Sequence, residues 1–133
     1  MDKKILLVED EAIIALTEMR QLKQAGYTVE HSLSGEQAIE LLNKPDHGIN
    51  LILMDIDLGP GIDGTVAARR IIENHNIPVL FLSSHTEKEI VEKTENITSY
   101  GYVVKNSGIV VLDASIKMAM RLFNAHTKLE EQR

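Results

Sequence analysis

The sequence predicts an α/β protein built as one doubly wound (βα)5 domain. Short apolar runs alternate with helical patterns five times along the chain, which is typical of a parallel sheet covered by helices on both faces. The length of 133 residues suits a single domain. Right-handed crossover connections then favour a five-stranded parallel sheet of order 2-1-3-4-5.

The first two strands flank a helix with one apolar face. Residues 3–8 (KKILLV) form the first predicted strand, and Gly26 ends the helix that follows it. Residues 27–32 (YTVEHS) form a more polar second strand, which we expect near an edge of the sheet. The expected buried face of the helix has the spacing i, i+3, i+4, i+7 and i+10 and consists of Ala12, Ala15, Leu16, Met19 and Leu22.

Capping residues predict where the next helices begin. Ser34 with Gln37 forms a capping box, and residues 49–55 (INLILMD) then give a central strand that is apolar on both faces. After the turn-rich loop 58–64 (LGPGIDG), Asp63 is placed to cap a third helix. The apolar faces of these two helices are Ala38, Leu41 and Leu42 in one and Ala68, Ile71 and Ile72 in the other.

The last third of the chain completes the alternation. Residues 77–83 (IPVLFLS) form the fourth strand, and Thr86 with Glu89 is a capping box for a weakly apolar helix through Ile90 and Val91. Residues 100–104 (YGYVV) form the fifth strand. A final helix is expected from about Val110 to Phe123, with two apolar seams, Leu112, Ile116, Ala119 and Phe123 in one and Val111, Met118 and Leu122 in the other.

Composition excludes several classes of function. The net charge is −6 and no basic stripe is present, so direct nucleic-acid binding is not expected. The chain has no cysteine, which excludes disulfides and thiolate metal sites, and its five histidines lack ligand spacing. No apolar run is long enough to span a bilayer and no signal peptide is evident. We therefore expect a cytoplasmic protein with no membrane contact.

Polar residues gather where the predicted strands end. Ligands of an open parallel sheet bind beyond the carboxyl ends of its strands, and strands one and three are neighbours in the predicted order. Glu9, Asp10 and Asp55 should therefore converge. The residues that follow strands one, three, four and five are Glu9, Asp10 and Glu11, then Asp55 and Asp57, then Ser83 and Ser84, then Lys105 and Asn106.

Converging carboxylates repel one another, and a divalent cation removes that cost. A few oxygen ligands with open positions suit Mg²⁺ better than Ca²⁺. The alternative is that Glu9 to Glu11 only cap the first helix. Asp55 is a metal ligand alone or also a nucleophile that forms an aspartyl phosphate, in which case Lys105 and Ser83 are placed to bind the transferred group.

The chain resembles the receiver domains of bacterial and archaeal two-component response regulators from about Lys3 to Phe123. The matching stretches are ILLVEDE, LILMDIDLGPGIDG, IPVLFLSSHTE and GYVVKN. The resemblance implies a flavodoxin-like fold and Mg²⁺ as cofactor. Asp55 would be the phosphoacceptor, served by a histidine kinase or phosphotransfer protein. Asp10 would bind Mg²⁺ directly, Glu9 through water, and Asp57 through its backbone carbonyl.

The resemblance also implies a switch. Ser83 and Lys105 would bind the phosphoryl oxygens, and Tyr102 would move inward when Ser83 is drawn to the phosphate. The alternative for Tyr102 is a half-buried aromatic on an edge strand, and the two are compatible. Asp57 and His85 lie two residues beyond Asp55 and Ser83, and we hypothesise that they tune the lifetime of the phosphoryl group.

Three features depart from the usual pattern of the family. The acidic pair is Glu9-Asp10 where two aspartates are commoner. Lys105 is followed by Asn106 in place of proline, so the bond is expected to be trans, because a cis bond before a non-proline residue costs about 2.5–4 kcal/mol. The loop LGPGIDG replaces the commoner turn after the phosphoacceptor.

Domain organisation and output are less specified. We expect a receiver domain over residues 1–124 and a polar helical tail or the start of a connector over 125–133. The chain is a single-domain regulator or a receiver cut from a longer protein that carries a downstream output domain. One seam of the last helix must pack on the sheet. The other is either a partner or homodimer surface or part of a broad core stripe.

The sequence leaves two alternative functions. The stretch DIDLG also resembles the nucleophile motif of haloacid-dehalogenase-like phosphohydrolases, but those enzymes place a second acid pair after the lysine. Here only Asp113 follows Lys105 closely. The second alternative is an interaction module on the same fold that works without phosphorylation. The presence of the complete set of acids, Ser83 and Lys105 argues against it.

Overall fold

A computed structural model describes residues 3–84, 92 and 100–132. Its five strands are all paired in parallel and have the predicted order β2-β1-β3-β4-β5. The strands are β1 (Lys4–Val8), β2 (Thr28–Ser32), β3 (Leu51–Asp55), β4 (Val79–Ser83) and β5 (Tyr102–Val104). The helices are α1 (Ala12–Gln24), α2 (Gly35–Leu42), α3 (Gly64–Asn74) and α5 (Ile109–Glu131). The helix predicted after Thr86 lies outside the described residues.

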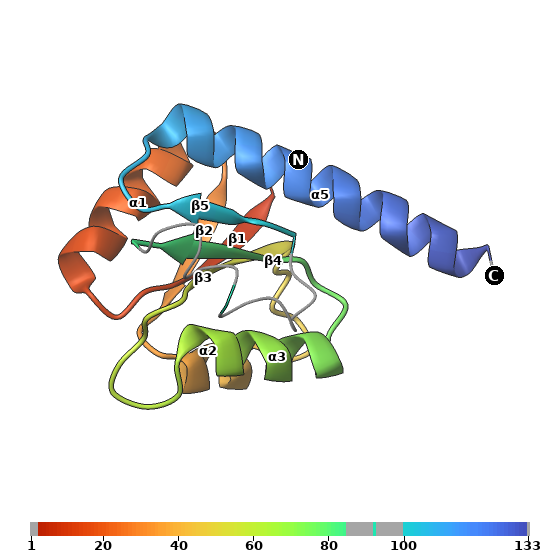
Figure 1. Cartoon of the computed structure of the whole chain (residues 1–133), viewed down its shortest axis with the longest axis horizontal. Coiled ribbons are helices and arrows are strands. Elements are labelled where there is room, and N and C mark those ends of the chain that lie inside the picture. Colours follow the sequence, from red (N-terminus) through yellow and green to blue (C-terminus); the bar gives the residue numbers. More distant parts are fainter. Residues whose placement is uncertain (1–2, 85–91, 93–99, 133) are drawn as a thin grey trace.

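Helices cover both faces of the sheet, as Figure 1 shows, with α2 and α3 on one side and α1 and α5 on the other. Each side has its own apolar core, because successive side chains of a strand point to opposite faces. The inner strands β3 and β4 are buried along their whole length, whereas β2 is mostly half-buried. The prediction that β2 lies at an edge is confirmed.

Two of the three predicted helix caps lie among the described residues, and both are present. The hydroxyl of Ser34 accepts a hydrogen bond from the backbone N–H of Gln37 at 3.1 Å, and the Gln37 side chain accepts one from the N–H of Leu33 at 3.0 Å. The carboxylate of Asp63 accepts from the N–H of Val66 at 3.0 Å. Each cap satisfies a backbone donor that the first turn leaves without a helical partner.

The predicted buried face of α1 is partly wrong. Leu16 is 62% exposed and Ala12 is also exposed, whereas the buried residues of the helix are Ala15, Glu18 and Leu22. These three lie at i, i+3 and i+7, which is a proper helical stripe. The apolar pattern predicted Ala15 and Leu22 correctly but not Glu18, because an acidic side chain occupies the middle position.

Helix α5 extends beyond the predicted end at Phe123 and runs to Glu131. Figure 1 shows its C-terminal part projecting past the sheet. In the first seam Leu112, Ile116 and Ala119 are buried, while the ring of Phe123 meets that of Tyr100 edge-on at 5.6 Å.

The second seam of α5 faces solvent and is not part of a core stripe. Val111, Met118 and Leu122 are 47%, 56% and 51% exposed.

No helix among the described residues is both long and apolar enough to cross a membrane.

Candidate functional site

Three carboxylates converge at the carboxyl ends of β1 and β3. Glu9 and Asp10 follow β1, Asp55 ends β3, and one oxygen of each lies within 4.8 Å of the others. Pairing of β1 with β3 brings these strand ends together, and the backbone N–H of Glu9 donates to the carbonyl of Ser32 at 3.1 Å. Glu9 is fully buried and Asp55 nearly so. The expected convergence of the acids is confirmed.

Lys105 bridges the two buried acids. Its ammonium lies 3.0 Å from Oε1 of Glu9 and 3.0 Å from Oδ2 of Asp55. The second oxygen of each acid accepts a backbone hydrogen bond, from Glu11 N–H to Oε2 of Glu9 at 3.2 Å and from Asp57 N–H to Oδ1 of Asp55 at 3.0 Å. Both carboxylates are therefore fixed in orientation from two sides.

The backbone at the end of β5 positions this lysine. The N–H of Lys105 donates to the carbonyl of Ser83 at 2.8 Å, which continues the pairing of β5 with β4. The Lys105–Asn106 bond is trans, as predicted; in the part of the chain that the structure describes, the cis bond is Gly59–Pro60. Asn106 takes a positive φ of 66°, a conformation that asparagine tolerates better than most residues.

A glycine lets α3 begin directly against the backbone of Asp55. The N–H of Gly64 donates to the carbonyl of Ile56 at 2.9 Å. A Cβ at position 64 would lie 1.8 Å from the backbone oxygen of Asp55, which is far inside van der Waals contact. Close packing of this helix start therefore holds the segment that carries Asp55.

The charges of the site are not balanced. Burial raises the pKa of Asp55 to about 7; the hydrogen bond from Lys105 opposes this rise, and nearby Glu9 adds to it. Burial would also raise the pKa of Glu9, but its hydrogen bonds to Lys105, Asp55 and the Glu11 backbone outweigh burial and lower it. Burial lowers the pKa of Lys105, yet its two acidic partners raise it overall. One ammonium faces three carboxylates, so the site favours a further cation.

The donor set fits Mg²⁺. All three groups that lie within 4.8 Å are carboxylates, and hard divalent cations take oxygen ligands. Because the protein supplies only a few carboxylates, some coordination positions of the cation remain for water and phosphate oxygens. This is common for Mg²⁺ sites in phosphoryl-transfer proteins. Asp10 is partly exposed, so the cluster opens toward solvent on its side.

Of the other predicted site residues, Ser83 and Asp57 lie at the same rim, whereas Tyr102 lies at the opposite end of the short strand β5. Ser83 is fully buried at the end of β4, and Tyr102 is 37% exposed on the edge strand β5. Asp57 is exposed two residues beyond Asp55. His85 lies outside the described residues.

One buried acid near this rim is not among the site residues predicted from the sequence. Glu18 on α1 is 9% exposed, and burial raises its pKa to about 7, with a further contribution from the charge of Glu9. Its spacing from Ala15 and Leu22 was the available signal, because it places Glu18 on the buried face of α1.

The fold and the acidic site together define a CheY-like signalling domain. A sequence profile of the response regulator receiver domain matches residues 5–117. The chain therefore belongs to the response regulator receiver domain family. This decides against the phosphohydrolase alternative left open by the sequence.

Curated relatives and solved structures agree with this family. The chain is 32% identical over 131 residues to the transcriptional regulatory protein PdtaR of Mycobacterium tuberculosis, covering 96% of this chain and 62% of PdtaR. It is 30% identical over 134 residues to the uncharacterized transcriptional regulatory protein YrkP of Bacillus subtilis, covering 99% of this chain and 55% of YrkP. The chain thus spans about six-tenths of the length of these relatives.

Among solved structures, one match is the N-terminal domain of a response regulator/sensory box/GGDEF 3-domain protein from Carboxydothermus hydrogenoformans. It has a TM-score of 0.85 and 45% identity, and the match covers 94% of this chain and 99% of that one. A CheY-like receiver domain protein from Methanospirillum hungatei has a TM-score of 0.81 over 95% of this chain and 99% of that one. At 21% identity, this second likeness speaks for the fold alone.

Proposed function

We propose that this receiver domain accepts a phosphoryl group on Asp55 in a Mg²⁺-dependent reaction. The donor is the phosphohistidine of a histidine kinase or phosphotransfer protein. The observation that carries the proposal is the position of Asp55, whose carboxylate lies within 4.8 Å of two further acids and 3.0 Å from the ammonium of Lys105. A nucleophilic carboxylate beside cation ligands and a fixed ammonium is the arrangement that phosphoryl transfer needs.

In the transfer step, a carboxylate oxygen of Asp55 forms a bond to phosphorus. The phosphorus–nitrogen bond of the donor histidine breaks, and its electron pair leaves with the imidazole. Hydrolysis of the resulting aspartyl phosphate returns the free carboxylate and inorganic phosphate. The backbone hydrogen bond from Asp57 to Oδ1 orients the carboxylate, so little reorganisation is needed before attack.

The ligands of the cation would be Asp10 and Asp55 through their carboxylates, Glu9 through a water, and Asp57 through its backbone carbonyl. When bound, Mg²⁺ neutralises part of the charge on the incoming phosphoryl group. Glu9 has one carboxylate oxygen held by a backbone N–H, which leaves its Lys105-facing oxygen to share between the lysine and the cation shell.

Lys105 and Ser83 would bind the transferred group. The ammonium of Lys105 already lies beside Asp55, and the ion pair with a phosphoryl oxygen would replace that contact. Phosphorylation adds about −1.5 to −2 charges. Movement of Ser83 toward this charge would draw Tyr102, now exposed on β5, inward and so change the output surface.

Asp57 and His85 are proposed to tune how long the phosphoryl group lasts. Asp57 is exposed beside the acidic site, where a carboxylate would alter the approach of the hydrolytic water. Unchanged dephosphorylation rates in both Asp57→Ala and His85→Ala would refute this role.

The output of the domain lies beyond the acidic site. We infer that a downstream domain or protein reads the switch, since the relatives PdtaR and YrkP, of which the chain spans only part, are named transcriptional regulatory proteins. The exposed seam of α5, formed by Val111, Met118 and Leu122, is available for such a contact or for a homodimer. Residues 125–133 would then begin a connector.

Incubation with acetyl phosphate and Mg²⁺, followed by intact mass spectrometry, tests the proposal. We expect the mass of one phosphoryl group to be added to the wild-type chain and lost slowly. Asp55→Asn should gain nothing, whereas Asp46→Asn, a matched change at an exposed aspartate before the start of β3, should behave as wild type. No gain in the wild type would favour a phosphorylation-independent module, and rapid turnover of phosphate esters would favour a hydrolase.

A further inference from the structure

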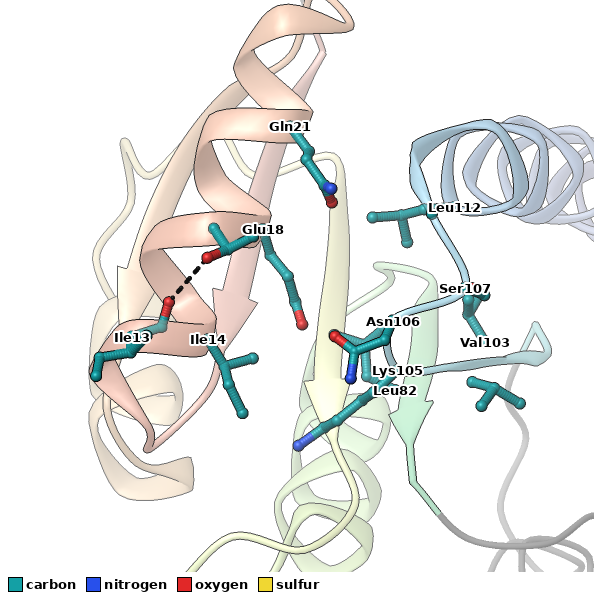
Figure 2. A pocket seen from close by; sticks show the side chains of 13 residues that line it. Ile13, Ile14, Glu18, Gln21, Leu82, Val103, Lys105, Asn106, Ser107 and Leu112 are labelled. Carbon is teal, nitrogen blue, oxygen red and sulfur yellow. Dashed lines mark hydrogen bonds between the residues drawn. The ribbon is translucent and has the colours of Figure 1, made fainter.

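Helix α5 carries a mostly apolar stripe on the side that faces away from its own core. The buried face of the helix is Leu112, Ile116 and Ala119, and Figure 2 shows Leu112 extending from the start of α5 toward α1. On the solvent side, residues recur at alternating steps of four and three, which is the spacing of the a and d positions of a coiled coil. These positions, called the heptad stripe, are Val111, Ser115, Met118, Leu122, Ala125 and Leu129.

The heptad stripe is open to solvent and narrow. Its four large apolar side chains are 47% to 63% exposed, and Figure 1 shows its C-terminal part on the portion of α5 that projects past the sheet. At the rise of an α-helix the stripe is about 27 Å long. It uses two positions of every seven, whereas a helix that packs on a core or lies in a membrane surface has a broader apolar face. The shape of the stripe therefore fits one partner helix.

Cations flank the heptad stripe on one side. Arg121 and Lys128 occupy g positions next to the stripe, and both are exposed. On the other side, the e positions Leu112 and Ala119 are buried in the core of the domain. A partner helix would therefore lie along the g side, within reach of both cations.

The acids of α5 are not placed to answer these cations. Within the described length of the helix, Asp113, Glu130 and Glu131 occupy positions f, b and c, away from the edges of the stripe. Asp113 already pairs with Lys117 at 3.0 Å. The edge of the stripe is therefore positively charged.

These charges disfavour the pairing of two copies of this chain. A parallel pair would place Arg121 against His126 of the second copy, because g positions face e positions there. An antiparallel pair would set the g positions of both copies, Arg121 and Lys128, against each other. Neither direction offers an acid, and charges at e and g decide which helices pair.

We propose that the heptad stripe binds an amphipathic helix of a partner protein that carries acidic residues beside an apolar seam. The apolar seam of the partner would cover Met118 and Leu122, and its carboxylates would pair with Arg121 and Lys128. This inference deepens the proposed function, on which it rests for the role of the contact, since it names the class of downstream partner.

The binding itself does not need phosphoryl transfer, so the two proposals fail separately. Asp55→Asn should bind the partner helix as the unphosphorylated wild type does, and Leu122→Asn should still gain one phosphoryl group from acetyl phosphate. Loss of phosphoryl uptake with intact helix binding would refute the proposed function alone.

The test measures fluorescence anisotropy of two labelled peptides titrated with the full chain at pH 7.5 and low salt. Both peptides have three heptads with Leu at a and d, and they carry either Glu or Lys at every e and g position. Like charges at these positions keep each peptide from pairing with itself. We expect saturable binding of the Glu peptide, weakened by added salt, and binding of the Lys peptide that is at least about tenfold weaker.

An apolar variant tests the stripe itself. Leu122→Asn should bind the Glu peptide at least about tenfold more weakly, because a polar side chain replaces an apolar contact at the centre. The matched control is Val110→Asn, which changes an 81% exposed valine of the same helix outside the heptad stripe. Equal binding by wild type and Leu122→Asn would overturn the proposal.

A charge reversal tests the selection of the partner. The double variant R121E/K128E should prefer the Lys peptide over the Glu peptide. The control K44E/R70E makes the same change in net charge at exposed residues, beyond the end of α2 and on α3, and should keep the preference for the Glu peptide. An unchanged preference in R121E/K128E, or no saturable binding of the Glu peptide by the wild type, would contradict the proposal.

Two further measurements address other occupants of the heptad stripe. Sedimentation velocity should show no dimer that depends on the stripe, and vesicles of phosphatidylglycerol should not bind through it. A wild-type dimer that Leu122→Asn dissolves would assign the stripe to a second copy. Vesicle binding that Leu122→Asn abolishes would assign it to a membrane surface, and either result would overturn the proposal.

Discussion

The acidic site holds the buried carboxyl group of Asp55, and helix α1 holds the buried carboxyl group of Glu18. Asp55 has the ammonium of Lys105 at 3.0 Å, while Glu18 has no such partner among the described residues. Burial raises the pKa of both groups to about 7. The comparison teaches that burial dominates in both places, and that one lysine shared with Glu9 offsets the burial of Asp55 only in part.

Removing the shared lysine should have the largest effect. Lys105→Met leaves Glu9 and Asp55 without their cation in a buried site, and breaking a buried ion pair in this way costs about 3–5 kcal/mol. The loss should be greatest at pH 8 and smaller at pH 5, where Asp55 takes up a proton because its pKa is raised to about 7. Urea unfolding at the two pH values without divalent cations measures it.

An equal loss of stability in Lys105→Met at pH 5 and pH 8 would contradict this prediction. It would mean that the lysine stabilises the fold through its packing and not through the two acids.

Neutralising Glu18 should increase the stability of the fold, whereas removing Lys105 should decrease it. The folded-state pKa of Glu18 is raised above 4.5, so the folded chain favours the protonated form, and its ionisation destabilises the fold increasingly between pH 4.5 and 7. Glu18→Gln should therefore be more stable than wild type by about 3 kcal/mol at pH 8 and by less than about 1 kcal/mol at pH 5. Parallel urea unfolding curves of the two proteins across this range give the difference.

Glu30→Gln serves as the control for this prediction, because Glu30 has Lys4 at 3.4 Å and a side chain that is 42% exposed. A gain at pH 8 of equal size in both variants would show that the effect does not depend on the burial of Glu18.

The smallest effect is expected at an exposed lysine. Lys117 pairs with Asp113 one helical turn away at 3.0 Å, with the lysine side chain 64% exposed. Lys117→Met should change the free energy of unfolding by less than about 0.5 kcal/mol at either pH. A change as large as that of Lys105→Met would remove the distinction between buried and exposed cations, and urea unfolding under the same conditions decides it.

The sheet and the acidic site were predictable from the sequence because their signals are local and redundant. The strands are short apolar runs, and their order follows from the handedness of the crossovers. Once that order is given, Glu9, Asp10 and Asp55 must share one edge. The trans Lys105–Asn106 bond followed from the absence of a proline.

Other features could not be predicted because they depend on packing between distant segments. The buried stripe of α1 passes through Glu18, and only the docking of α1 against the sheet shows that Leu16 turns outward. The double ion pair of Lys105 depends on the side-chain conformations of three residues from separate strand ends. The polar helical tail expected over 125–133 is continuous with α5, and the sequence did not show this continuity because the last turns are exposed and lack a buried apolar face.

Calorimetric titration with Mg²⁺ tests the central claim, that three carboxylates from two strands form one divalent-cation site around Asp55. We predict saturable binding of one Mg²⁺ by the wild type and by Glu18→Gln, and no saturable binding by Asp10→Asn. Equal binding by wild type and Asp10→Asn, or loss of binding in Glu18→Gln alone, would contradict the account.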